Sequence, residues 1–244
     1  MLTCLTVTDL TRMQGQRVCV AGYTDADVCV RLDFPTGRLT ESWLRIDAQQ
    51  VIRPFSVVEL DLLWPKPKPP HTEDWVVDPE RRALRRLLPT AEREALLKRL
   101  ADDSVESIFG AGIHTGPGWY VQTGEGQRSL GTIAPSLVRE VTFFPNYSGT
   151  WNYRLAFDDQ AGRSYCLMVT DLAFRYYLDC RRTRERLPHA AAAHQLTEAL
   201  QKARVYLRIG LARGWVKYPG RCYLQITGVY SFPDYLGGRC FADF

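Results

Sequence analysis

The chain has 244 residues and a formal net charge of +4, with 45% hydrophobic and 24% charged side chains. This composition is that of a folded globular protein with room for one large domain or two small ones. No apolar run approaches the roughly 20 residues that a membrane-spanning helix needs, so the sequence excludes such a helix.

Cysteine usage and the first residues indicate the compartment. The seven cysteines have no CxxC spacing, and several, such as Cys19 and Cys29, lie between valines. Such cysteines are typical of small buried side chains in a reducing environment. Residues 1–5 have neither the basic region nor the apolar core of a secretory signal. We therefore expect a cytoplasmic protein.

The N-terminal part is predicted to form a small β-barrel or sandwich. Its β-rich runs are residues 17–23, 28–32 and 56–63, and Gly, Pro and Asp turns separate them. The prolines of residues 64–70 end the last run, because proline has no N–H to donate to a neighbouring strand. We assign the first barrel to residues 1–79.

A helical insert is expected next. Asp78 is a candidate N-cap with Pro79 at the first helical position, which predicts a helix that ends at Pro89. Thr90 predicts the start of a second helix, which ends near Leu100.

Charges nearly balance in the insert, with seven basic and six acidic side chains in residues 80–106. This balance is typical of a solvated amphipathic face. Residues 108–131 contain seven glycines and are predicted to form a loop and a short hairpin. The insert and this connection together make up residues 80–131.

The remaining chain, residues 132–244, is predicted to form a second barrel with an internal helix. Alanine density after Pro188 predicts a helix that extends to about Ala203. The expected strands are residues 138–144, 151–157, 164–169, 205–211 and 221–230. The fold class is therefore mainly β with α insertions: two small barrels joined by a helical insert.

Charge is distributed unevenly along the chain. Residues 163–221 hold twelve Lys or Arg against four acids, a net charge of +8, so the rest of the chain sums to −4. Seven aromatic residues are interleaved with these charges. Positive charge attracts a phosphate backbone and flat rings stack on bases, so this pattern favours a nucleic-acid-binding protein over an enzyme.

Six short motifs of strand and turn residues are spread over both halves. They are residues 18–22, 52–55, 69–75, 169–174, 206–211 and 222–228. Together they resemble bacterial dual OB-domain proteins. The resemblance implies two OB-like barrels, nucleic-acid binding and a link to bacterial conflict or nucleic-acid-processing systems, and it supplies no catalytic residue. Residues 80–106 and 181–186 would be elaborations of this member.

A basic, aromatic face of the second barrel is the leading candidate site, because OB barrels stack bases on rings and pair phosphates with cations. Strand alternation places Tyr165 on one face with Leu167. It also places Arg208 opposite Leu207 and Ile209, so Arg208 is expected to be exposed. The candidate residues are Arg163, Tyr165, Arg175, Arg181, Arg182, Arg208, Arg213, Lys217 and Tyr218.

Other polar motifs predict no catalytic residue, metal site or cofactor. His71, Glu73 and Asp74 could bind a metal or exchange protons, but turn and capping roles explain them more simply. Residues 110–118 are glycine-rich but lack the Gly-Lys-Ser/Thr ending of a phosphate-binding P-loop. No histidines have i,i+4 spacing, and no GxSxG motif is present.

Three functional hypotheses remain open. The first is a non-enzymatic adaptor that binds single-stranded or flexible DNA or RNA through the second barrel. The second is a protein-interaction subunit of a bacterial defence or nucleic-acid-processing system that docks through residues 80–106. The third, a nuclease or other hydrolase, needs convergent carboxylates that the sequence does not assemble. The basic face could also meet an acidic protein or remain solvated.

Overall fold

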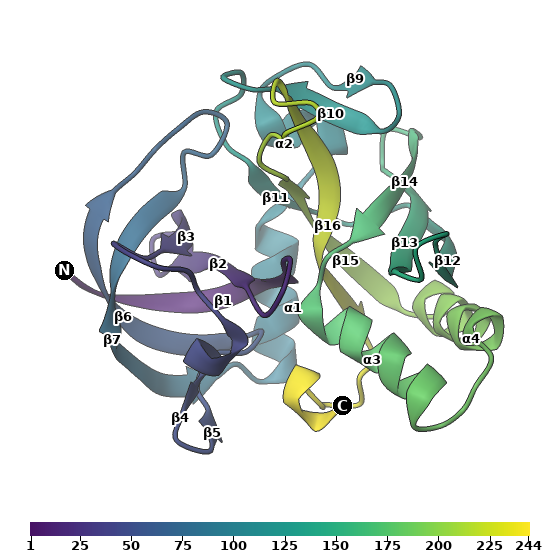
Figure 1. Cartoon of the computed structure of the whole chain (residues 1–244), viewed down its shortest axis with the longest axis horizontal. Helices are drawn as coiled ribbons and strands as arrows, with labels where there is room; N and C mark the ends of the chain where they lie inside the picture. The colour runs from purple at the N-terminus through teal and green to yellow at the C-terminus, as the bar shows by residue number, and fades with distance from the viewer.

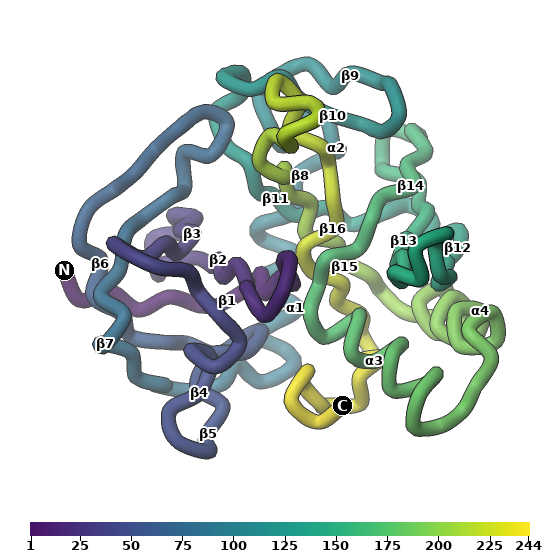
Figure 2. Tube along the Cα trace, in the orientation of Figure 1, coloured from purple at the N-terminus to yellow at the C-terminus, as the bar shows by residue number.

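The computed structural model describes all of residues 1–244. Two β-rich halves lie side by side, the N-terminal half on the left of Figure 1 and the C-terminal half on the right. The trace in Figure 2 shows both chain ends on the outside of this arrangement. None of the helices combines the length and the apolar character needed to cross a membrane.

The N-terminal half is a closed five-stranded barrel with a small hairpin beside it. Its elements are β1 (Leu2–Arg12), β2 (Val18–Thr24), β3 (Cys29–Asp33), a 3₁₀ turn (Glu41–Leu44), β4 (Arg45–Ile46), β5 (Gln49–Gln50), β6 (Ser56–Pro65) and β7 (Asp74–Leu87). The barrel closes in the order β1-β2-β3-β7-β6, and β4 and β5 form the hairpin. Only the β3–β7 pair is parallel.

The helix expected over residues 78–89 is wrong, because this stretch is mostly the second half of β7. The pairing with β6 shifts register so that residues 78–81, Pro79 among them, bulge out of the sheet. A bulge is one of the few places where a sheet accepts proline. Leu84, whose spacing suggested a helix, pairs instead with Val58 of β6.

The barrel therefore extends past residue 79 to Leu87, and the helical insert is shorter than expected. It consists of α1 (Thr90–Arg99), which confirms the second predicted helix, and α2 (Val105–Phe109). Pro89 occupies the N-cap position of α1 and ends the preceding strand segment. The insert thus follows the barrel directly as a compact helical segment.

The C-terminal half is built on a nine-stranded sheet. Its strands are β8 (Ala101–Asp102), β9 (His114–Thr115), β10 (Trp119–Gln122), β11 (Leu130–Ile133), β12 (Leu137–Pro145), β13 (Trp151–Asp158), β14 (Ser164–Val169), β15 (Arg204–Leu211) and β16 (Arg221–Phe232). Their order is β12-β13-β14-β16-β15-β11-β8, and β10 joins β9 to β16. A second β unit is therefore present, but it is an extended sheet, and β8 to β11 in residues 101–133, mostly expected in the insert and its connection, belong to it.

One strand path occurs in both halves. β1-β2-β3-β7-β6 in the first half corresponds to β12-β13-β14-β16-β15 in the second. In each path the third strand pairs in parallel with the fourth: β3 with β7, and β14 with β16. The first path closes through the β1–β6 pair, whereas the second continues from β15 into β11. A five-stranded, partly open barrel is the form that OB folds take.

Two helices lie between β14 and β15 and cover one side of the C-terminal half (Figure 1). They are α3 (Leu172–Thr183) and α4 (His189–Gln201). α4 confirms the alanine-rich helix and packs along β12. α3 was not predicted; the Asp171 carboxylate caps it by accepting hydrogen bonds from the N–H groups of Ala173 and Phe174. Asp171 thus fixes the start of α3.

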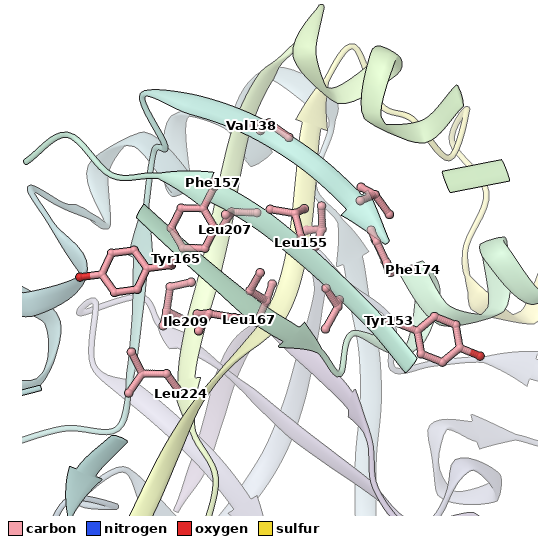
Figure 3. Close-up of a cluster of buried hydrophobic side chains, with 14 of the residues drawn as sticks. Val138, Tyr153, Leu155, Phe157, Tyr165, Leu167, Phe174, Leu207, Ile209 and Leu224 are labelled. Carbon is pink, nitrogen blue, oxygen red and sulfur yellow. The ribbon is translucent and has the colours of Figure 1, made fainter. Parts of the chain in front are cut away.

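Apolar side chains fill each half and also the contact between the halves. Figure 3 shows the core of the C-terminal half, where Leu155, Phe157, Tyr165 and Leu207 lie together. A third cluster joins the halves through Phe55, Val57, Leu88, Leu96, Leu97, Tyr206, Tyr230 and Phe232. A closing 3₁₀ turn (Phe241–Asp243) places Phe241 in the core of the first barrel. The chain therefore folds as one packed body.

Candidate nucleic-acid interface

Arg208 is fully buried, so the expectation of an exposed Arg208 is wrong. Its guanidinium donates to the Asp9 carboxylate at 2.9 Å and to the Tyr23 hydroxyl at 2.8 Å. It also donates to Thr132 Oγ1 at 2.7 Å. Alternation along β15 predicted exposure because it assumed solvent on one face, but β1 and β2 of the first barrel cover that face. Arg208 is a structural residue between the halves.

Tyr165 is also buried, and its ring packs between Phe157 and Trp119 in the core. It has no free face on which a base could stack. The shared face of Tyr165 and Leu167 is confirmed, but it is the interior face. Neighbouring Arg163 lies over the Trp119 ring at 4.6 Å and pairs with Glu106.

The three candidate arginines on α3 are engaged within their own half. Arg175 donates to the Val169 carbonyl at 2.8 Å, and burial lowers its pKa. Arg181 pairs with Glu185, and the guanidinium of Arg182 lies 4.3 Å from the Trp151 ring centre. These side chains do not converge on one surface with the other candidates.

Arg213, Lys217 and Tyr218 are brought together by the loop between β15 and β16, residues 212–220. Arg213 and Lys217 are exposed and Tyr218 is half-buried. Arg213 reaches across to the first barrel, where its Nη2 lies 2.5 Å from Asp74 Oδ2. This loop is the part of the predicted site that faces the other half.

A cleft of about 780 Å³ lies between the two halves beside this loop. One wall comes from the β1–β2 connection, β3 and residues 66–68, and the other from residues 211–213, Thr170 and Gln225. The charged lining residues are Arg12, Arg17, Arg31, Arg38, Lys66, Lys68 and Arg213, against Asp9, Asp33 and Asp74. The lining therefore carries a clear excess of positive charge.

Part of this charge is neutralised by ion pairs. The Asp74 carboxylate bridges Arg31 and Arg213, each at 2.5 Å, and Lys66 pairs with Asp33 at 2.8 Å. Three other lining cations make no ion pair: Arg17, Arg38 and Lys68. Unpaired cations on the walls of a cleft attract a polyanion, because the low-dielectric walls focus their field.

The residues next to the cleft are connected by hydrogen bonds. The Glu73 carboxylate accepts hydrogen bonds from the Ser129 hydroxyl at 3.0 Å and the Leu130 N–H at 3.0 Å. Arg31 donates to Ser129 as well, at 3.1 Å. Glu73 and Asp74 thus tie the first barrel to the second half, which is a larger role than the turn and cap expected. No group of three or more His, Cys, Asp or Glu side chains is arranged to hold a metal ion.

Sequence reasoning missed most of the cleft. Six of its seven cations come from residues 1–79, which carry more acids than bases. They are spaced over residues 12–68, so no local window showed them as a basic patch. The one local signal was the alternation of lysine and proline in residues 65–68, which puts two cations on an extended segment.

The chain is thus a protein with two OB-like units that meet at a basic cleft. The family described as Dual OB-containing domain matches residues 2–229, so the chain belongs to this family. This confirms the resemblance of the sequence motifs. No curated protein matches the chain.

Proposed function

We propose that this protein is a non-enzymatic adaptor that binds single-stranded or flexible DNA or RNA in the cleft between its two halves. The observation that carries the proposal is the excess of cations lining that cleft in a member of the dual OB-containing family. OB folds hold oligonucleotides through basic grooves and aromatic side chains. The phosphate backbone of the strand would lie along Arg17, Arg38 and Lys68, which have no competing carboxylate.

The test measures fluorescence anisotropy of labelled single-stranded DNA, single-stranded RNA and double-stranded DNA across a salt series. The wild type is expected to bind a single strand with an affinity that falls linearly with the logarithm of salt concentration. The triple variant Arg17→Gln, Arg38→Gln, Lys68→Gln removes three phosphate contacts. It should therefore reduce the slope for a single strand by about 2.

A matched control removes the same charge elsewhere. The variant Lys98→Gln, Arg184→Gln, Lys202→Gln neutralises three exposed cations outside the cleft. It should keep nearly the wild-type affinity and slope. Equal losses in the two variants would show that binding is not located in the cleft. No binding of any of the three nucleic acids at low salt would refute the proposed function.

No observation favours the alternative of a docking subunit without nucleic-acid contact. Its docking element was the exposed insert of residues 80–106, but the first part of that stretch is β7. α1 buries Leu96 and Leu97 in the cluster between the halves. Its Arg99 pairs with Asp27 of the first half, and its Glu94 pairs with Arg204 of the second half. The contacts of α1 are therefore made within this chain, between its two halves.

A further inference from the structure

Five aromatic rings form a row to which β9, β10, the first part of β16 and the β15–β16 loop contribute. β9, β10 and this loop lie at the top of Figure 1. The rings form what we call the aromatic row: Trp215, Tyr218, Tyr223, Tyr120 and His114. The distances between successive ring centres, in that order, are 5.9, 6.4, 5.8 and 5.3 Å. Two stretches of the chain, residues 114–120 and 215–223, contribute to this row.

Two cations are interleaved with the rings. The Arg221 guanidinium lies 4.6 Å from the centre of the Tyr120 ring and 4.9 Å from that of Tyr218. The Lys217 ammonium lies 5.6 Å from the Tyr218 ring and 5.9 Å from the Trp215 ring. Neither cation has an ion pair, so each remains available to a phosphate while it orders the rings by cation–π contact.

The end of the row at Trp215 is open to solvent. The Trp215 side chain is 56% exposed, and Val216 beside it is 94% exposed. A backbone hydrogen bond of 2.7 Å from the Tyr218 N–H to the Trp215 carbonyl fixes the turn that presents them. A large apolar side chain held in solvent next to unpaired cations is typical of a binding surface.

The loop that carries the first two rings of the row also borders the cleft. Arg213 lines the cleft, is anchored to Asp74 of the first barrel, and precedes Trp215 by two residues. A strand whose phosphates lie in the cleft and that leaves it past Arg213 would meet the Trp215 ring. Rings with cations between them match the alternation of bases and phosphates along a single strand.

We propose that the aromatic row is a base-stacking subsite, in which an unpaired base of a strand leaving the cleft stacks on the exposed Trp215 ring while Lys217 and Arg221 contact the phosphates. This inference rests on the proposed function, because the row extends the same site. It predicts a preference for single strands, since the bases of a duplex stack on one another and offer no free face to a protein ring.

The test compares two labelled probes of equal charge: an oligothymidylate of about 15 nucleotides, a length that OB folds cover, and an abasic strand of the same length. The wild type should bind the oligothymidylate more tightly than the abasic strand. Trp215→Ala should weaken oligothymidylate binding at least about fivefold and leave binding of the abasic strand unchanged. Trp215→Phe, which keeps a flat ring, should restore most of the preference.

Tyr147→Ala is the matched control, because Tyr147 is a fully exposed aromatic residue at the β12–β13 turn, outside the row and the cleft. It should leave both affinities unchanged. Equal wild-type affinity for the two probes, or an unaltered preference in Trp215→Ala, would overturn the subsite and leave the proposed function standing. Failure of both probes to bind at low salt would overturn both.

Discussion

His71 shows how the environment of one side chain sets its chemistry. It is buried, and neither ring nitrogen has a hydrogen-bond partner. Burial first, and then the cations Arg31, Arg213 and Lys68, lower its pKa to about 3. Because the folded-state pKa lies below the unfolded value of about 6.5, the neutral ring favours the fold above pH 6.5. That contribution is lost as pH falls toward 3.

We therefore predict that His71 makes the protein sensitive to acid. Between pH 6.5 and pH 3, unfolding lets this residue take up a proton, at about 1.4 kcal/mol per pH unit. His71→Asn removes the titrating group at similar size. Urea unfolding of both proteins from pH 7 to pH 4 should show a steeper decline in the wild type. Parallel declines would mean that the buried ring does not control this response.

Residue-level prediction from sequence depends on what covers each strand face. For Ser164–Val169 alternation correctly placed Tyr165 and Leu167 on one face, but that face is buried and Tyr165 is not open to a base as expected. For Arg208 the same argument gave the wrong exposure, because both faces of β15 are covered. The identity of the covering element, here the first barrel with Asp9, depends on a contact between residues about 200 positions apart. No local pattern carries that information.

At the scale of elements, local propensity predicted α4 and failed at β7. Alanine favours a helix in almost any setting, so α4 needed no partner to be recognised. In β7 the signals of a helix start, Asp78 and Pro79, became a bulge because pairing with β6 outweighed propensity. α3 escaped prediction for a related reason: its aromatic residues are weak helix formers, and packing stabilises them.

α1 supports a prediction that separates a structural element from a docking element. Leu97 on α1 is fully buried in the cluster between the halves. Leu97→Ala should lower the free energy of unfolding by about 2–5 kcal/mol, because it leaves a cavity there. The neighbouring exposed Lys98→Gln should change it by less than about 0.5 kcal/mol. Equal, small effects in urea unfolding would indicate that α1 is only loosely attached.

For the whole molecule, the sequence motifs predicted the two OB-like units but not the cleft between them. The cleft depends on how the units pack, and that packing is set by scattered contacts. Glu73 binds Ser129, Tyr230 donates to the Thr8 carbonyl at 2.7 Å, and Arg208 pairs with Asp9. The basic segment of residues 163–221 contains the loop that borders the cleft, while most of its cations serve internal contacts. Net charge along the chain was therefore an incomplete guide to charge on the surface.

These contacts predict that the two halves unfold together. Arg208 and Asp9 are both buried, so Arg208→Ala leaves an unpaired carboxylate in the interface and should cost about 3–5 kcal/mol. Fluorotryptophan labelling with ¹⁹F NMR in urea can follow Trp43 in the first barrel and Trp151 in the second half separately. Both signals should share one midpoint in the wild type, and that midpoint should move for both in Arg208→Ala. A shift confined to one half would mean that the halves are independent domains and that the cleft between them has no fixed shape.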